Sequence, residues 1–287
     1  MSWLIVGTVP RRDFPLVHHP ARICNGTLSV DGHDVAVARG TPALAAAACL
    51  TCLELNITPP DVLLCGDIGD GDGSRRIYRY LTESGLAHTN YSGILFHYLQ
   101  PDVDWHNRIL IAIDELPERP LLLADAGYMY VAKMSGYAAA YDLFTPDAGE
   151  LAFLADEKAP HPFYTRGFLL HEENRVPDLI RKAAACGNTA RHLLVKGQSD
   201  HIVSGGNIVA VISTPCVEAM EPVGGTGDSL AGIVLGLTAS GKSIPDACIQ
   251  ASRINRYMGL YANPTPAFSI SDLLRFLPQA MQKHFTC

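Results

Sequence analysis

The segment VGGTGD at positions 223–228 places three glycines and a carboxylate directly before an apolar run with helical spacing. Glycines before a helix leave backbone N–H groups free to converge on an anion, and the helix N-terminus adds roughly half a positive charge. Such a segment suits a phosphate group in transfer. Asp228 could be only an acid that stabilises the start of the helix, but the repeated glycines favour a general base.

We therefore predict that Asp228 accepts the proton of a hydroxyl group that attacks a phosphoryl group. The general base and the backbone donors of the anion hole would then lie in the same turn of the chain. The residues predicted to bind the phosphate are Gly224, Gly225, Thr226 and Gly227.

Lys196 and Gly197 end another apolar run, HLLVKG. The lysine could reach a phosphate, and the glycine could let a nucleotide approach the backbone. The alternative is an ordinary surface lysine with a buried aliphatic stem.

Asp147 and Glu150 are three residues apart and follow a predicted strand. Carboxylates in this position could face Mg²⁺ on nucleotide phosphates. The alternative is an acid pair at the start of a helix. Asp125, at the end of LLLAD, could cap the next helix or contact a ligand, and the sequence does not separate the two.

Short β-rich runs alternate with longer helical runs along the chain, which indicates a parallel sheet covered by helices on both faces. Each apolar run ends in polar or glycine residues, and in open parallel sheets ligands bind at that edge. The segment 41–56 predicts a helix from position 42 with Thr41 as N-cap. Asp31-Gly32 predicts a turn between two short strands. Three helices are predicted in the last third, the last of them capped by Ser269 or Ser271.

The composition and the net charge favour small molecules as the partners of this protein. The chain has 287 residues, 48% of them hydrophobic, and a formal net charge of −7. We expect one domain over 1–287, no nucleic-acid or membrane partner, and a cytoplasmic location. The oligomeric state stays open, a homo-oligomer included. Cys49 and Cys52 form a C-x-x-C in an alanine-rich helical pattern, and we interpret them as core thiols.

The segment VGGTGDSLAGIVLGL resembles the C-terminal signature of the ribokinase-like superfamily, and most closely its branch of ADP/ATP-dependent NAD(P)H-hydrate dehydratases. The resemblance extends over roughly residues 40 to 280. It includes, in the right order, RGTPALAAAA, IGDGDGS, LLLADAG, FTPDAGELAFL and LLVKGQSDHIV.

The resemblance implies a three-layer α/β/α sandwich with a mainly parallel central sheet, a nucleotide (ATP or ADP) and Mg²⁺. Gly40 and Thr41 would face the substrate, and Gly71 and Asp125 would belong to the same substrate site. Glu150 matches the acid of the family. The reaction would be phosphoryl transfer to a hydroxyl group, followed in the dehydratases by loss of phosphate.

The chain also departs from the dehydratase pattern. Asp147 and Ala148 replace the histidine and second proline of T-P-H-P-G-E, and Asp70 and Asp72 add negative charge to the glycine-rich loop. Such charges oppose a dinucleotide with its own phosphates. Two alternatives therefore remain, a kinase of a small sugar or alcohol and a binding protein without turnover. The charged and proline-rich segment 156–178 is expected to be a loop near the site.

Overall fold

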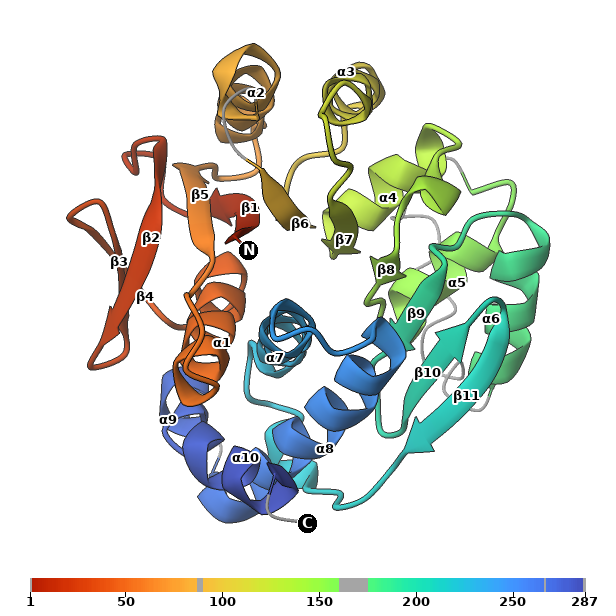
Figure 1. Ribbon diagram of the computed structural model, residues 1–287. Helices are drawn as coiled ribbons and strands as arrows, with labels where there is room; N and C mark the ends of the chain where they lie inside the picture. The colour runs from red at the N-terminus through yellow and green to blue at the C-terminus, as the bar shows by residue number, and fades with distance from the viewer. Residues whose placement is uncertain (1, 87–89, 160–174, 266, 286–287) are drawn as a thin grey trace.

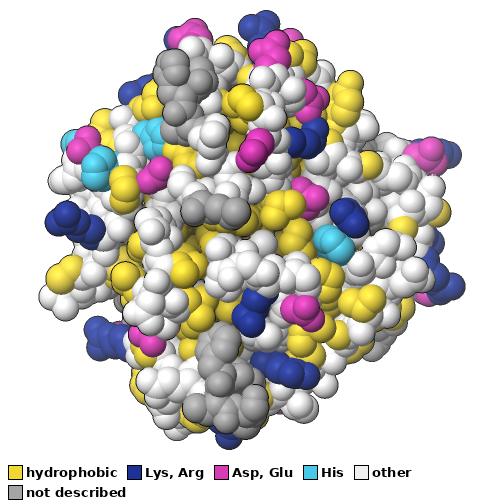
Figure 2. Space-filling model, viewed as in Figure 1, with side chains coloured by type: hydrophobic (Ala, Val, Ile, Leu, Met, Phe, Trp, Pro, Cys, Tyr) yellow, Lys and Arg dark blue, Asp and Glu magenta, His cyan; other side chains and the backbone are white. Residues whose placement is uncertain are grey.

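The protein is described from a computed structural model, which covers residues 2–86, 90–159, 175–265 and 267–285. Of the segment 156–178, expected as a loop near the site, residues 160–174 lie outside this description. In the described part of the chain, no helix combines the length and the apolar character that crossing a bilayer requires. On the face shown in Figure 2, acidic and basic side chains are interspersed.

One sheet of eleven strands runs through the described residues in the order β11-β10-β9-β8-β7-β6-β1-β5-β2-β3-β4. The six central strands, from β9 to β5, are parallel, whereas the strands at both ends pair antiparallel. The strands are β1 (Ser2–Val9), β2 (Val17–Cys24), β3 (Thr27–Val30), β4 (His33–Ala36), β5 (Asp61–Gly66), β6 (Tyr91–His97), β7 (Leu121–Asp125), β8 (Leu143–Phe144), β9 (His192–Val195), β10 (Asp200–Ser204) and β11 (Asn207–Ile212).

Helices cover both faces of this sheet, which curves around α1, α7 and α8 (Figure 1). Helices α2 to α6 lie on the outer face. The helices are α1 (Thr41–Glu54), α2 (Asp72–Tyr80), α3 (Val103–Asp114), α4 (Gly127–Met134), α5 (Ala148–Ala155), α6 (Val176–Ala185), α7 (Thr226–Ala239), α8 (Ile244–Ala262), α9 (Ile270–Leu274) and α10 (Leu277–Phe285). Each face has its own apolar core, because alternate residues of the buried strands point to opposite sides.

The predicted α/β architecture with a mainly parallel central sheet is confirmed. The turn at Asp31-Gly32 joins β3 to β4, with positive φ at both residues as this type of hairpin requires. Cys49 and Cys52 are free and buried. Burial raises the pKa of the Cys52 thiol to about 12, as expected for a core residue.

Two local predictions need correction. Gly40, not Thr41, is the N-cap of α1, and the Thr41 hydroxyl lies against a side chain of β6 instead. The last predicted helix is two helices, α9 and α10. Ser269 does cap α9 through a reciprocal capping box with Asp272.

Helices α1 and α7 pack so closely that only glycine fits at their crossing. A Cβ on Gly232 of α7 would lie 2.2 Å from the backbone oxygen of Leu44, and one on Gly236 would lie 2.7 Å from the Thr51 side chain. Gly232 lies against Leu44, and Gly236, one turn later, lies against Thr51. Later residues of α7 thus contact later residues of α1, so the two helices run in the same direction. Their N-termini therefore meet at one edge of the sheet.

The strand register brings three residues into one row at this edge. Gly7 of β1 pairs with His97 of β6, and His97 pairs with Asp125 of β7. A Cβ on Gly7 would lie 2.5 Å from Thr41 Oγ1, so the glycine leaves the room in which the start of α1 reaches His97.

We predict that Gly232→Ala destabilises the protein by about 1–3 kcal/mol, because the added methyl group collides with the backbone of α1. Denaturant unfolding measures this change. Gly197→Ala is the matched control, since its Cβ would meet nothing nearer than 3.7 Å and should change stability by less than about 0.5 kcal/mol. Equal stability of the two variants would refute the tight crossing.

Candidate active site

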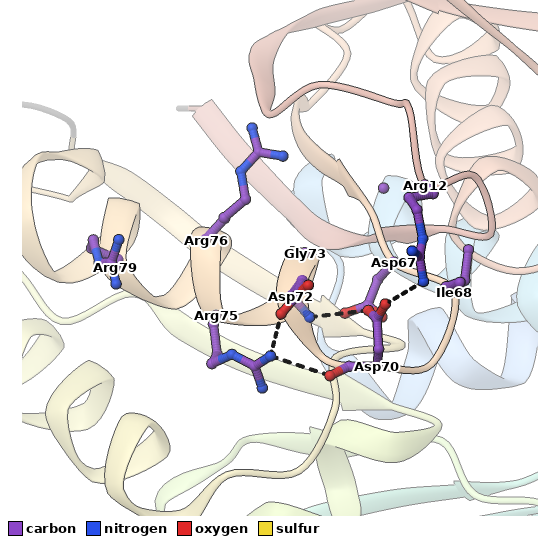
Figure 3. Close-up of a pocket in the computed structure, with 10 residues that line it drawn as sticks. Arg12, Asp67, Ile68, Asp70, Asp72, Gly73, Arg75, Arg76 and Arg79 are labelled. Atoms are coloured by element: carbon purple, nitrogen blue, oxygen red, sulfur yellow. Dashed lines mark hydrogen bonds and ion pairs between the residues drawn. The ribbon is translucent and has the colours of Figure 1, made fainter.

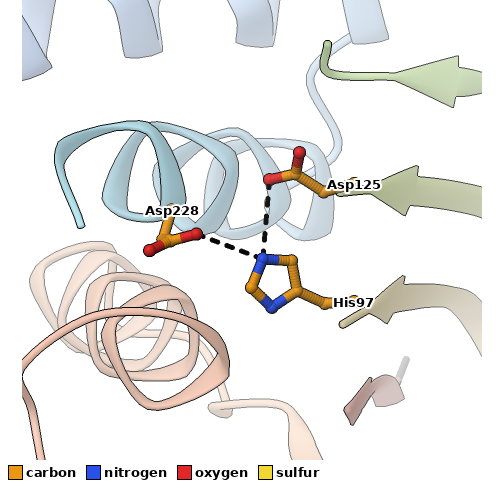
Figure 4. Close-up of side chains that lie close together, drawn as sticks. All are labelled: His97, Asp125 and Asp228. Carbon is orange, nitrogen blue, oxygen red and sulfur yellow. Dashed lines mark hydrogen bonds and ion pairs between the residues drawn. The ribbon is translucent and has the colours of Figure 1, made fainter. Parts of the chain in front are cut away.

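Asp228 lies in the first turn of α7 with a side chain that is only 14% exposed. Its Oδ2 accepts the backbone N–H of Gly40 at 2.6 Å, and its Oδ1 lies 3.2 Å from His97 Nε2 (Figure 4). Burial disfavours the charged carboxylate, but His97, the charge of Lys196 and the Gly40 N–H outweigh it. The pKa of Asp228 is consequently lowered, and the carboxylate is ionised at neutral pH.

The surroundings of Asp228 are built for negative charge. Because α1 and α7 are parallel, the positive ends of both helix dipoles point at this carboxylate. Within the described part of the chain, the backbone N–H groups of Thr226, Gly227 and Asp228 have no hydrogen-bond acceptor. Gly225, the N-cap of α7, adopts a left-handed φ of 96° that turns the chain into the helix. The first turn of α7 thus offers free donors to an anion.

His97 is fully buried at the end of β6 and contacts three polar side chains. Its Nδ1 lies 3.0 Å from Thr41 Oγ1, and its Nε2 lies 3.2 Å from Asp228 and 3.9 Å from Asp125 Oδ2. Thr41 has no exposed surface. Gly40 and Thr41, which the resemblance assigned to substrate contact, form hydrogen bonds with Asp228 and His97 in the structure.

Lys196 joins the same cluster from the end of β9. Its Nζ lies 2.8 Å from Asp125 Oδ1, and the side chains are 13% and 2% exposed. A Cβ on Gly227 would lie 3.6 Å from this Nζ, so the ammonium group also faces the start of α7. Burial opposes the charge of the lysine, but Asp125 and Glu150 outweigh it and raise the pKa of Lys196. The lysine is a fixed cation beside the free N–H groups.

Asp147 and Glu150 form a capping box at the start of α5. Asp147 Oδ1 accepts the Glu150 N–H at 2.7 Å, and Glu150 Oε2 accepts the Asp147 N–H at 2.8 Å. The acid pair at a helix start, one of the two interpretations of the sequence, is therefore present. Burial and the charge of Asp147 raise the pKa of Glu150 to about 8, with Lys196 acting in the opposite direction.

The glycine-rich loop after β5 is organised around its own carboxylate. Buried Asp67 accepts the N–H groups of Gly69, Gly71 and Ser74 and the Ser74 hydroxyl. Burial opposes ionisation, but these donors outweigh it and lower the pKa of Asp67. Gly71 is the left-handed N-cap of α2, and in the sheet β1 and β6 lie between β5, which this loop follows, and β7. The structure does not bring Gly71 to Asp228.

A cavity of about 420 Å³ adjoins this loop, and it shares no residue with the Asp228 cluster (Figure 3). Arg12 pairs with Asp70 at 2.9 Å, and Arg75 pairs with Asp72. The prediction that these two aspartates give the loop an excess of negative charge is therefore wrong, because each lies against an arginine. Two further arginines, Arg76 and Arg79, also line this cavity.

Most predicted site residues meet at the carboxyl edge of the sheet, whereas Gly71, Asp147 and Gly197 do not contact Asp228. Asp147 and Gly197 are exposed at the rim. The residues gathered around the start of α7 are Gly40, Thr41, Asp125, Glu150, Lys196, Gly224, Gly225, Thr226, Gly227 and Asp228.

Three neighbours of the site were not predicted. His97 ends an apolar run just as Asp125 does, and this polar end was the signal that could have found it. Tyr98 follows it, and burial together with the charge of Asp228 raises the pKa of its hydroxyl to about 12. Arg39 lies against the glycines before α7, with its Cδ 3.9 Å from the position of a Cβ on Gly224.

We predict that Lys196→Met destabilises the protein by about 3–5 kcal/mol, because it leaves the Asp125 carboxylate buried without its cation. Asp125→Asn in the same chain should recover part of the loss, as measured by denaturant unfolding. Arg108→Met is the control, since its pair with Asp104 is exposed and should be worth about 0–1 kcal/mol. No recovery in the double variant would count against a specific Lys196–Asp125 pair.

The sequence profile of a family described as NAD(P)H-hydrate dehydratase matches residues 105–278. Gly40, Thr41 and the glycine-rich loop lie outside this match. An uncharacterized protein of Methanocaldococcus jannaschii is 37% identical over 222 residues, which is 77% of this chain and 90% of that protein. The ADP-dependent (S)-NAD(P)H-hydrate dehydratase of Cenarchaeum symbiosum is 30% identical over 61% of this chain, which spans only 55% of that relative.

Solved structures of other proteins have the same fold as this chain. The ADP/ATP-dependent NAD(P)H-hydrate dehydratase of Bacillus subtilis, co-crystallised with ATP and Mg²⁺, superposes with a TM-score of 0.56 at 16% identity, covering 98% of this chain and 89% of that one. Phosphofructokinase-2 of Escherichia coli gives 0.55 at 13% identity, covering 98% and 99%. The fold is thus that of the ribokinase-like proteins, and the chain belongs to the NAD(P)H-hydrate dehydratase family of enzymes.

Proposed function

We propose that the protein is a nucleotide-dependent dehydratase of hydrated nicotinamide dinucleotides, in which Asp228 is the general base. The observation that carries the proposal is the ionised, largely buried Asp228 in the first turn of α7, in a chain of this family. A carboxylate enclosed by two helix N-termini is ready to accept a proton from a hydroxyl group held against it.

The nucleotide phosphates bind at Gly224–Gly227, in front of the free N–H groups of α7. Those donors, together with the fixed cation Lys196, supply the positive potential that phosphate groups require. Because the donors are fixed in place before the reaction, they stabilise charge that develops on the transferred phosphoryl group. The Cenarchaeum relative is an ADP-dependent dehydratase and the Bacillus dehydratase was co-crystallised with ATP, so either nucleotide is a candidate.

The residues at the start of α5 fit Mg²⁺. Asp147 and Glu150 each use one carboxylate oxygen in the capping box, which leaves the other oxygen free. Mg²⁺ prefers hard oxygen ligands and commonly takes one or two carboxylates beside phosphate and water. When bound, the ion neutralises phosphate charge. Because the pKa of Glu150 is about 8, this carboxyl must release its proton to become a ligand at neutral pH.

The chemical steps follow from this arrangement. The substrate hydroxyl attacks the terminal phosphorus while its proton passes to Asp228, and the bond from phosphorus to the leaving nucleotide oxygen breaks. The phosphorylated substrate then loses phosphate as the C–O bond breaks. The proton on the neighbouring carbon passes to solvent, and its C–H electron pair restores the double bond of the reduced nicotinamide.

A small-molecule kinase is the second candidate, and Asp147-Ala148 favours it. These residues stand where the dehydratase pattern has a histidine and a proline. Asp70 and Asp72 are paired with arginines, so their charges oppose a dinucleotide less than the sequence indicated. The two reactions can be distinguished by their products, since a kinase leaves a stable phosphate ester and a dehydratase releases inorganic phosphate.

We predict that Asp228→Asn lowers turnover by about 10² to 10⁴, the range for a lost general base. The assay incubates protein, Mg²⁺ and ATP or ADP with hydrated NADH or NADPH, and follows inorganic phosphate and the restored nicotinamide absorbance. A rise in melting temperature with nucleotide, in wild type and variant alike, would show that binding is retained.

Asp246→Asn is the matched control, because Asp246 is also a first-turn acid, in α8, and should leave turnover unchanged. Near-normal turnover of Asp228→Asn would remove Asp228 from the chemistry. A stable phosphate ester from a sugar or alcohol, without activity on the hydrated dinucleotides, would replace the dehydratase by the kinase. A nucleotide-induced rise in melting temperature without turnover of any acceptor would favour a binding protein.

A further inference from the structure

His97 is the one polar side chain of the described cluster that touches both Asp228 and the start of α1. Its ring is fully buried between α1, α7 and the end of β7 (Figure 4). Nδ1 lies 3.0 Å from Thr41 Oγ1, and Nε2 lies 3.2 Å from Asp228 Oδ1. A residue held on both sides in this way orients its partners.

The partners determine the hydrogen positions on the ring. The ionised Asp228 carboxylate can only accept a hydrogen bond, so Nε2 carries the hydrogen and donates. In the neutral ring, Nδ1 is then the acceptor, and the Thr41 hydroxyl donates to it. The Asp228 carboxylate therefore selects the tautomer, and the Thr41 hydroxyl, which can donate or accept, satisfies Nδ1.

Asp125 supplies a second, unused acceptor for the same N–H. Its Oδ1 accepts from Lys196 and from the Ala126 N–H, both at 2.8 Å. Its Oδ2 is buried and has no hydrogen-bond partner among the described residues, although it lies 3.9 Å from His97 Nε2. One donor therefore lies between two carboxylates, nearer to Asp228.

The same three side chains invite comparison with a metal site. Ligand atoms of His97, Asp125 and Asp228 lie within 4.8 Å of one another. Two observations favour a proton on Nε2 instead of a metal. The Nε2–Asp228 separation is a hydrogen-bond distance, and the Lys196 ammonium group, 2.8 Å from Asp125, repels a second cation.

We propose that His97 is the positioning residue for Asp228, with Thr41 holding its Nδ1 and Asp125 offering its N–H an alternative acceptor. The inference rests on the proposed function, in which Asp228 is the base. His97 holds Oδ1 while the Gly40 N–H holds Oδ2, so the carboxylate has one orientation before substrate arrives.

During turnover, Asp125 can accept the His97 N–H while Asp228 holds a proton. When the substrate hydroxyl forms its bond to phosphorus, its proton moves to Asp228, and the bond to the leaving nucleotide oxygen breaks. Neutral Asp228 is a weaker acceptor than a carboxylate, whereas Asp125 Oδ2 still has no hydrogen-bond partner among the described residues. The His97 N–H can then turn toward Asp125, and it returns when Asp228 loses the proton.

The pH dependence of Asp228 tests this role. Donation from His97 favours the ionised carboxylate, so its loss must raise the pKa of Asp228. The base works only when ionised, and activity falls as the pH drops through this pKa; a higher pKa moves the loss to higher pH. The other charged or titratable groups nearby are Tyr98, Asp125, Glu150, Lys196 and, beside the glycines, Arg39.

The experiment compares His97→Gln with His97→Asn. Glutamine can present an N–H near the position of Nε2, whereas the shorter asparagine reaches only Thr41. The primary readout is the ¹³C NMR titration of the Asp228 carboxyl carbon, assigned by its absence in Asp228→Asn. We expect His97→Gln to titrate near wild type and His97→Asn to titrate about one unit higher.

The second readout is the pH profile of kcat/KM with hydrated NADH. In His97→Asn the acid limb should move upward by the same amount, and kcat should fall about tenfold or more while KM changes little. His106→Gln is the matched control, since His106 is equally buried but bonds to Tyr141 and Ser135. It should leave the Asp228 titration unchanged. If His97→Asn fails to fold, Thr41→Val replaces it, with a smaller shift in the same direction.

Three results would overturn the proposal. The first is an unchanged Asp228 titration in both His97→Asn and Thr41→Val. The second is an equal shift in His97→Gln and His97→Asn, which would show that the N–H at Nε2 has no special role. The third is a rise in melting temperature with Zn²⁺ or Mn²⁺ that His97→Gln abolishes, which would assign the cluster to a metal. The NMR titration needs no turnover, so it decides the role of His97 even if the dehydratase assay fails.

Discussion

The close parallel packing of α1 and α7 is the constraint on which the candidate active site depends. Gly232 and Gly236 let the two helices approach, and the approach brings Gly40 within 2.6 Å of Asp228. Parallel helices at this distance place two positive dipole ends side by side, which is unfavourable without a neighbouring negative charge. Asp228 supplies that charge. The same carboxylate therefore stabilises the helix pair and is the base that we propose.

The sheet completes the site from the other side. Its register sets Gly7, His97 and Asp125 in one row, and the end of β9 adds Lys196. Each of the buried charges has a partner in this group, which is the condition under which charged residues can be buried at all. The site is consequently a property of several strands and two helices together, and no single segment of chain contains it.

The site combines one local segment, the start of α7, with residues from several strands. This difference determines which of its residues could be predicted from the sequence. Asp228 and its glycines were found because the motif is local, with donors and carboxylate in one turn of chain. His97 was missed because its role depends on β1 lying between β5 and β6 and on α1 reaching over Gly7, and neither is visible as a pattern. The N-cap of α1 was misplaced by one residue for the same reason, since the Thr41 hydroxyl bonds to His97 and not to its own helix.

The edges of the sheet were less predictable than its centre. The central strands are buried on both faces and have continuous apolar sequences. By contrast β2, with the sequence VHHPARIC, has exposed side chains and a proline and lacks a strand pattern. The pairing of Asp70 and Asp72 with arginines was also invisible, because Arg12 comes from a distant part of the chain and side-chain direction decides the Arg75 contact.

In the mechanism that we propose, the hydrogen bond from the Gly40 N–H to Asp228 affects how the enzyme returns to its resting state. When Asp228 holds a proton, the two helix ends lose the charge between them, and the backbone donor of Gly40 faces a weaker acceptor. The fold is then less stable than in its resting state, and this difference in energy drives the proton off again. We expect the base to regenerate readily after each cycle, because the architecture that holds it also disfavours its protonated form.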